Sequence, residues 1–213
     1  MHVWTALAAA PLGFVTGWFL APLSVRYSGA PSRARRLSIA AVTAVVCGAF
    51  GWRFGATAVL PAYLYLGVVG TLLTFIDIAV KRLPDRLTLP SYVIGTALFG
   101  AAIPGTGDGG VRFGYALIGM AALWLLYGVQ YFFAPSQIGR GDVKLAGVLG
   151  LYLGWLGQAS WVLGVVLGFV FGGLVAIALL VSRRASRKSQ MPFGPYMVAG
   201  AVAAILISGL PGP

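Results

Sequence analysis

The chain has 213 residues, of which 59% are hydrophobic and 9% are charged, and its mean hydropathy is +0.91. This composition is typical of a polytopic membrane protein and excludes an ordinary soluble domain. The net charge of +11 is dispersed over loops, so it does not predict a nucleic-acid-binding face. With a single Cys, Cys47, and a single His, His2, a disulfide framework, a thiolate zinc site and a His-activated nucleophile are excluded. Hydrolytic chemistry is left to carboxylates or a Ser-Lys pair, and we expect no metal and no cofactor.

Hydropathy predicts an all-α bundle of about eight transmembrane spans, because a helix needs about 20 apolar residues to cross a bilayer. The apolar runs 37–80 and 145–182 are divided near Arg53 and at Gly157-Gln158, because each run as one uninterrupted helix would be far longer than the bilayer core is thick. A seven-span or re-entrant arrangement is the alternative. The predicted spans are Val3 to Leu23, Leu37 to Gly51, Phe54 to Val80, Leu87 to Ile103, Phe113 to Ala134, Leu145 to Leu156, Ser160 to Ser182 and Phe193 to Leu210.

The positions of the basic residues predict the topology. All of the fifteen Lys and Arg residues except Arg53 and Arg112 fall in four alternate loops. Since Lys and Arg accumulate on cytoplasmic loops, these four loops are predicted to lie in the cytoplasm and both chain ends outside. No polar or Pro/Ser-rich run is long enough to be a linker, so residues 1–213 are predicted to form a single integral-membrane domain.

Two of the four acidic residues, Asp77 and Asp142, adjoin long apolar runs on the predicted cytoplasmic side. Ionisable residues in a membrane segment are candidates for function. Two neighbouring carboxylates can share one proton, so that one activates water while the other polarises a carbonyl, as in aspartyl proteases. Asp142 opens a helix whose N–H groups favour an anion, and Asp77 lies between Ile76 and Ile78, where desolvation favours the protonated form. We therefore expect Asp142 to be the base and Asp77 the acid.

Structural roles for these two residues remain alternatives. Asp142 could be only an N-cap of the sixth span, which is a common use of Asp. Asp77 could be paired with Arg140 or Lys144. If either aspartate had only a structural role, the catalytic pair would lack one of its two carboxylates.

The other two acidic residues are assigned lesser roles. Asp85, in LPDRLTLP, lies in a basic loop before the fourth span, where Pro84 and Pro90 restrict the turn, so capping or loop ordering is favoured. Asp108, in PGTGDGG, also spells G-x-G-D, but Gly and Pro surround it on the outer side and no apolar helix is predicted to start at it. We interpret Asp108 as a chance match.

Small residues line the predicted sixth span at helical spacing. Gly147, Gly150, Gly154 and Gly157 would form one smooth face of that helix. Small residues let membrane helices approach closely, so helix packing is the expected role of this face.

Three motifs together resemble the type IV prepilin peptidases, a family of GxGD aspartyl proteases. The segment from Asp77 to Pro90 resembles the family's D-x7-D motif ending in LPDxLTLP, and the segment from Gly139 to Leu145 resembles its GxGDxKL motif. The third motif is the PFGP sequence before the last span. The resemblance runs from about Thr71 to Leu210. Besides the two aspartates, the motif residues are Asp85, Gly139, Gly141, Lys144, Pro192, Phe193, Gly194 and Pro195.

The resemblance implies that Asp77 and Asp142 are the catalytic aspartates of an enzyme in the plasma membrane of a prokaryote. It also implies that the enzyme cleaves prepilin or pseudopilin precursors at the cytoplasmic face of the membrane. In these precursors a short basic leader precedes a hydrophobic helix. Lys144 matches the Lys of the family's motif. Two roles are possible for it: tuning the ionisation of Asp142, or organising the loop. Arg140 falls at a variable motif position and is interpreted as a topological charge.

Two departures from the family pattern affect the expected activity. Many members carry two CxxC pairs between their first two spans and an acidic residue early in the second, and they also N-methylate the new terminus. The segment from Ser24 to Arg36 has no Cys, and RRLSIAAVTAVV has no acid. A peptidase without methyltransferase activity is therefore predicted.

Other functions compatible with the two aspartates are kept open. A presenilin-like protease also uses GxGD, but it pairs this motif with YD and PAL motifs, whereas here Ile76 precedes Asp77. A small ion- or proton-coupled transporter could use Asp77 and Asp142 as its binding site. A catalytically inactive assembly subunit is the third alternative.

Overall fold

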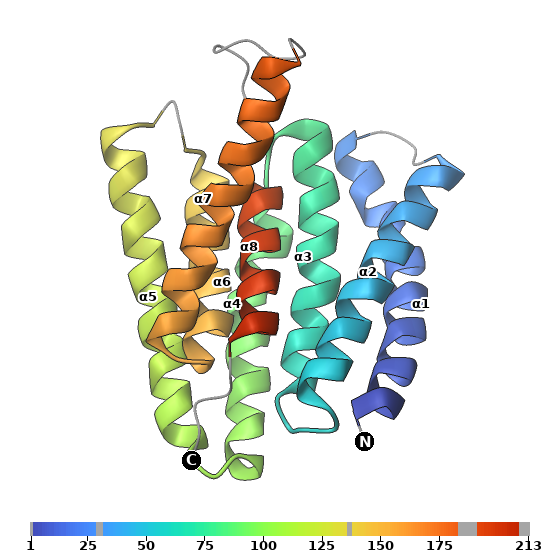
Figure 1. The fold of residues 1–213 in the computed structure, drawn as a ribbon, viewed down its shortest axis with the longest axis vertical. Helices are drawn as coiled ribbons and strands as arrows, with labels where there is room; N and C mark the ends of the chain where they lie inside the picture. Colours follow the sequence, from blue (N-terminus) through green and yellow to red (C-terminus); the bar gives the residue numbers. More distant parts are fainter. Residues whose placement is uncertain (1, 29–31, 136–137, 183–190, 209–213) are drawn as a thin grey trace.

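The computed structural model describes residues 2–28, 32–135, 138–182 and 191–208, although the side chains of 25–28 are not described. These residues form eight α-helices and one short 3-10 helix, η1 (Figure 1). The elements are α1 (His2–Ser28), α2 (Arg33–Phe54), α3 (Leu60–Val80), α4 (Asp85–Ala102), η1 (Ile103–Gly105), α5 (Gly109–Phe133), α6 (Arg140–Trp155), α7 (Gln158–Val181) and α8 (Gly194–Ile207).

Successive helices run in opposite directions through one bundle (Figure 1). We call the end where α3 finishes and α4 begins the upper end, as in Figure 1, and the end where α1 begins the lower end. Six helices of the described chain are long and apolar enough to cross a membrane. The remaining two, α6 and α8, are shorter, with 16 and 14 residues. The predicted all-α bundle of about eight helices is confirmed.

Glycine ends two helices at the predicted breaks. Gly55 follows α2 with φ of 61°, and Gly157 separates α6 from α7 with φ of 107°. Both values lie in the left-handed region, which glycine adopts at no steric cost because it has no Cβ. The predicted divisions near Arg53 and at Gly157-Gln158 therefore follow from local backbone chemistry.

The short helix α6 lies in the centre of the bundle. All of its residues from Leu145 to Trp155 are buried. Gly150 and Gly154 pack directly on the backbone of α5: a Cβ on Gly119 of that helix would lie 2.5 Å from the carbonyl oxygen of Gly150. The prediction that glycines let α6 pack closely is confirmed for this pair of helices.

The predicted glycine face is wrong at Gly157, and at Gly147 it packs against a side chain of α4 instead of the backbone of α5. Gly147 faces the Tyr92 hydroxyl from α4 rather than the backbone of α5. That hydroxyl donates to the Lys144 carbonyl oxygen over 2.6 Å, so the missing Cβ makes room for a tyrosine. Gly157 lies beyond the end of α6, where it forms the break before α7.

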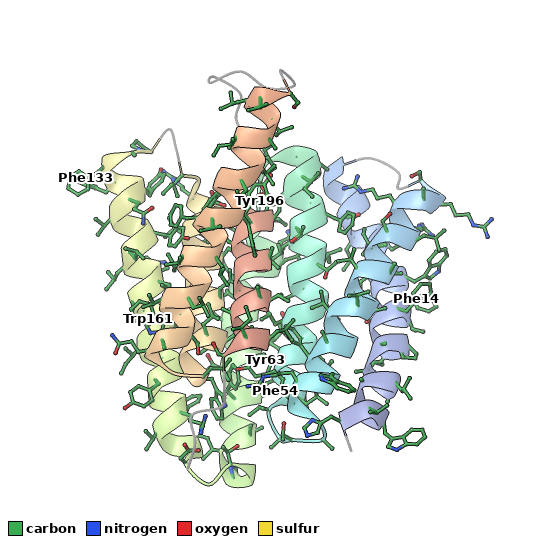
Figure 2. All side chains as sticks on the ribbon, viewed as in Figure 1. Phe14, Phe54, Tyr63, Phe133, Trp161 and Tyr196 are labelled. Atoms are coloured by element: carbon green, nitrogen blue, oxygen red, sulfur yellow. The ribbon has the colours of Figure 1, made fainter. Side chains whose placement is uncertain are left out.

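Aromatic side chains fill the lower half of the bundle. Tyr63 stacks on Phe54 with ring centroids 4.1 Å apart, and both labelled side chains lie in the lower half of Figure 2. Phe99 stacks on Trp155 at 4.6 Å, and Tyr152 joins the cluster edge-on. These five side chains are almost completely buried. The polar motif residues are found at the other end.

Candidate active site at the upper end of the bundle

Asp77 lies in the last turn of α3 and is 4% exposed. The helix ends because Lys81 adopts a left-handed conformation, with φ of 51°, while its N–H still donates to the Asp77 carbonyl oxygen over 2.8 Å. A non-glycine residue in this region is uncommon in proteins. The Asp77 carboxylate accepts a hydrogen bond of 3.0 Å from the backbone N–H of Gly194, at the start of α8. The end of α3 and the start of α8 are thus joined at the carboxylate.

Asp142 lies in the first turn of α6, which begins at Arg140 after Gly139. Its carboxylate accepts a 3.0 Å hydrogen bond from the Gly139 N–H. Glycine has no side chain to return the contact, so only half of a capping box is present. Asp142 is therefore not the N-cap residue, although it satisfies an N–H at the same helix end. Burial raises the pKa of Asp142 above its ordinary range, and the hydrogen bond from Gly139 opposes this shift.

Both carboxylates line one cavity of about 340 Å³ at the upper end, and the charge of Asp142 acts electrostatically on Asp77. The structure thus brings together two acids from distant parts of the chain. All of its lining residues belong to the first two motifs. The lining residues are Asp77, Lys81, Arg82, Leu83, Asp85, Gly139, Arg140, Gly141, Asp142 and Lys144.

Two cations of this cavity are engaged by groups other than Asp77. The Lys144 ammonium pairs with the Asp85 carboxylate over 2.6 Å, and Arg140 donates to the Tyr131 hydroxyl over 3.0 Å. Among the described residues, neither cation pairs with Asp77, so the alternative of a purely structural ion pair for Asp77 is not supported. Through this contact Lys144 of α6 is joined to Asp85.

Asp85 is the first residue of α4, not part of the loop before it. No side-chain hydrogen bond caps α4, so the capping role proposed for Asp85 is wrong. Its carboxylate instead links α4 to α6 through Lys144. The linkage joins the first and second sequence motifs.

Two glycines of the motifs are located where a side chain would not fit. A Cβ on Gly141 would lie 2.8 Å from the Cβ of Leu83, and a Cβ on Gly194 would lie 2.8 Å from a carboxylate oxygen of Asp77. Phe193 immediately precedes α8, and a proline, Pro195, lies in the first turn of that helix. Proline is well suited to this position because its missing N–H has no helical partner there.

Asp108 lies at the lower end, away from this cavity (Figure 1). It is the residue before α5, so the expectation that no apolar helix starts at it is wrong. Its carboxylate pairs with Arg112 over 2.6 Å, and this contact lowers the pKa of Asp108. The interpretation of Asp108 as outside the catalytic pair agrees with its location.

Three residues near the cavity were not found from the sequence. Tyr127 of α5 is buried and interacts electrostatically with Asp142, Tyr92 supports Lys144, and Arg35 donates to the Phe75 carbonyl oxygen over 2.8 Å. Each is an ordinary residue at the end or on the face of an apolar helix, so no local pattern distinguishes it. In the part of the chain that the structure describes, no three His, Cys, Asp or Glu residues are grouped to hold a metal ion.

Comparisons with known proteins agree with these motifs. The model of the type IV leader peptidase family matches residues 63–181. A prepilin leader peptidase/N-methyltransferase of Aeromonas hydrophila is 34% identical over 189 residues, which cover 86% of this chain and 59% of the relative. The proteins of the same name are 36% identical over 146 residues in Aeromonas salmonicida strain A449 and 30% identical over 163 residues in Pseudomonas aeruginosa. The Aeromonas salmonicida match covers 67% of this chain and 48% of the relative. The Pseudomonas aeruginosa match covers 76% of this chain and 54% of the relative. The chain thus spans about half the length of the curated relatives it matches, and the comparison with solved structures gives no match.

Proposed function

Because the chain belongs to the type IV leader peptidase family, we propose that it is a membrane aspartyl endopeptidase that removes the leader peptide from prepilin or pseudopilin precursors. The observation that carries this proposal is the shared cavity of Asp77 and Asp142. Two carboxylates that face the same space are the chemical requirement of aspartyl catalysis. The motif-bearing core is assigned to residues 71–210 within a single integral-membrane domain.

The proposed reaction is hydrolysis of one peptide bond by one water molecule. Ionised Asp142 takes a proton from water as the water oxygen bonds to the scissile carbonyl carbon, while protonated Asp77 donates its proton to the carbonyl oxygen. The tetrahedral intermediate then collapses: the carbonyl re-forms, the C–N bond breaks, and the leaving nitrogen takes the proton held by Asp142. The hydroxyl proton returns to Asp77. A coupled pair titrates as one unit, so the two roles describe one protonation state.

The backbone N–H groups of Gly194 and Gly139 support this division of work. Each donates to one oxygen of one carboxylate, which leaves the second oxygen of each acid for water or substrate. The hydrogen bonds also fix the orientation of the two side chains. Positioning of reacting groups before the reaction is a large part of enzymatic rate acceleration.

The upper end is assigned to the cytoplasm, with both chain ends outside. Lys81 and Arg82 follow α3, and Arg140 and Lys144 lie in the first turns of α6, so these basic residues are at the same end as Asp77 and Asp142, which supports cleavage at the cytoplasmic face of a prokaryotic plasma membrane. The expected partners are the precursor protein and the lipid bilayer, with no nucleic acid. The oligomeric state is not assigned.

We propose peptidase activity alone, although the relatives are named for both peptidase and N-methyltransferase activity. The single Cys of this chain, Cys47, cannot form the two CxxC pairs that many family members carry. The transporter alternative is not favoured, because Asp77 and Asp142 lie together at one end of the bundle rather than along a path through it.

Co-expression of a prepilin-type precursor with Asp77→Asn and Asp142→Asn variants tests the proposal. Each variant should abolish the mobility shift of leader removal on a gel, while Asp108→Asn should process like the wild type. Equal processing by all four proteins would exclude the aspartyl mechanism. Incubation of the purified wild type with labelled S-adenosylmethionine and a precursor tests whether the protein also has methyltransferase activity. Methylation of the new terminus would overturn the assignment of peptidase activity alone.

A further inference from the structure

The hydroxyl of Tyr92, on α4, reaches the backbone of α6 close to Asp142. It donates to the Lys144 carbonyl oxygen over 2.6 Å, which is within the usual range for an O–H···O hydrogen bond. The backbone of Val148 also forms a hydrogen bond with the same hydroxyl. In an α-helix the carbonyl of residue 144 is the partner of the N–H of residue 148. The hydroxyl therefore contacts both groups of one main-chain pair, and the carbonyl of that pair lies two residues beyond Asp142.

Gly147 makes this contact possible. It lies about one turn beyond Lys144, and the side chain of a helical residue covers the turn before its own Cα. A Cβ at residue 147 would meet the Tyr92 hydroxyl, and it would lie only 3.0 Å from the ring carbon that carries this hydroxyl. Any residue larger than glycine would therefore displace the hydroxyl from the Lys144 carbonyl.

The segment from Leu83 to Tyr92 holds the first turns of α6 from one side. Leu83 packs on Gly141, where an added Cβ would lie 2.8 Å from the Leu83 Cβ. The Asp85 carboxylate pairs with the Lys144 ammonium, but both side chains are partly exposed, so solvent weakens this contact. The Tyr92 hydroxyl bonds to the carbonyl of the same lysine in a partly buried position. Of these two contacts to Lys144, the one from Tyr92 is the better shielded.

The start of α6 needs an external anchor because its own capping is weak. The residue before the helix is Gly139, which has no side chain to accept from the first N–H groups. Instead, the carboxylate of Asp142 accepts from the Gly139 N–H. In the proposed reaction Asp142 gains and loses a proton, and a hydrogen bond to a neutral carboxyl is weaker than one to a carboxylate. The contact from Tyr92 does not depend on the protonation of Asp142.

We propose that Tyr92 is a positioning residue for catalysis: its hydroxyl fixes the first turns of α6 and so keeps the Asp142 carboxylate in place in the cavity that it shares with Asp77. The proposal rests on the proposed peptidase function. Tyr92 does not line that cavity, so it acts through the backbone of α6 rather than by contact with the reacting groups. Its loss should therefore reduce kcat, which depends on the placement of the reacting groups, and leave KM nearly unchanged.

The test compares variants of the full chain, purified in lipid nanodiscs, in cleavage of one precursor peptide. Tyr92→Phe removes only the hydroxyl and should lower kcat about tenfold, less than the roughly hundredfold loss that a misplacement of about 1 Å can cause, with KM changed by less than about twofold. Gly147→Ala displaces the hydroxyl without removing it, so it should cause a loss of similar size. In the double variant the two losses should not multiply, because both changes act on the same contact.

Tyr65→Phe is the matched control. The Tyr65 hydroxyl forms a hydrogen bond of 3.0 Å with the Ser91 hydroxyl, so this variant removes one partly buried hydroxyl contact between α3 and α4. It should lower Tm in a similar way to Tyr92→Phe but leave kcat and KM unchanged, because the lost contact does not reach the first turns of α6. A merely structural role for Tyr92 would change Tm alone.

The results separate the role of Tyr92 from the peptidase function. A kcat of Tyr92→Phe equal to that of the wild type would overturn this role, and so would an equal loss of kcat in Tyr65→Phe. Losses that multiply in the double variant would also overturn it, because the two changes would then act independently.

If Tyr92→Phe does not fold, Gly147→Ala serves instead. Failure of both variants to fold, while Tyr65→Phe folds, would show that the contact is required for folding rather than for positioning, and would overturn the proposal as well. Failure of the wild type to cleave any precursor would contradict the peptidase function itself.

Discussion

The backbone N–H of Gly194 donates to the Asp77 carboxylate over 3.0 Å, which joins the beginning of α8 to the end of α3. A Cβ at residue 194 would lie 2.8 Å from the same carboxylate oxygen, closer than real Cβ contacts. The glycine of the third motif thus has two requirements: it must donate to the acid, and it must have no side chain.

Gly194→Ala should displace Asp77 while preserving the fold. A small misplacement of a reacting group can reduce the rate about a hundredfold, so we expect a loss of that order in kcat. The measurement is cleavage of a precursor peptide by purified variants. Gly173→Ala is the matched control, because no atom lies within 4 Å of the added Cβ there, and it should cleave like the wild type. Full activity of Gly194→Ala would show that the close contact does not constrain Asp77.

The pH dependence of cleavage should reflect the environment of Asp142. Burial raises the pKa of this carboxyl above its ordinary value of about 3.9. The base must be ionised, so activity should be lost as the pH falls through this raised pKa, and the acid limb of kcat/KM should lie above about pH 4. A second ionisation, that of the proton shared by the pair, should appear at higher pH. A single ionisation between about pH 3 and 9 would contradict the coupled pair.

The Lys144–Asp85 ion pair should contribute modestly to stability. It spans 2.6 Å, but the two side chains are 30% and 57% exposed, so screening by solvent limits its contribution to about 0.2–1 kcal/mol. A double-mutant cycle with Lys144→Met and Asp85→Asn, followed by unfolding in detergent, measures the coupling. The coupling should decrease in high salt. A coupling larger than this range would mean that the pair is more shielded than its exposure indicates.

Gly150→Ala should destabilise the contact between α5 and α6. The added Cβ would meet the Gly119 carbonyl oxygen of α5, and backbone atoms cannot move aside as a flexible side chain can. Overpacking of this kind costs about 1–3 kcal/mol, which should lower Tm in detergent. Gly114→Ala on α5 is the control: nothing lies within 4 Å of its Cβ, so Tm should stay the same or rise. Equal Tm values for both variants would disprove the close approach.

Asp108 should affect stability without affecting catalysis. Arg112 lowers the pKa of Asp108, so the ion pair stabilises the folded state above the carboxyl's unfolded pKa of about 4 and loses this effect as the pH falls through the lower, folded value. Asp108→Asn should therefore lower Tm at neutral pH, and the difference from the wild type should vanish in acid. Thermal unfolding in detergent at several pH values measures it. A difference that grows on acidification would contradict this sign.

The sequence alone determined the class of the fold and the candidate residues. Hydropathy predicted about eight helices, and Gly157 marked a break that the structure places between α6 and α7. The separate motifs selected Asp77 and Asp142 among four acids. These features depend on local composition, on backbone conformation and on spacing along the chain, which can be read from a single sequence.

Only the tertiary structure decided which of these groups meet. It paired Lys144 with Asp85 and placed Tyr92 against Gly147. It also brought the Gly194 N–H to Asp77. Such contacts depend on the rotation and depth of helices that are far apart in the sequence, and a shift of one residue would turn a side chain toward another neighbour. Hydropathy is similar on every side of a membrane helix, so it does not specify that rotation, whereas close packing of small residues does.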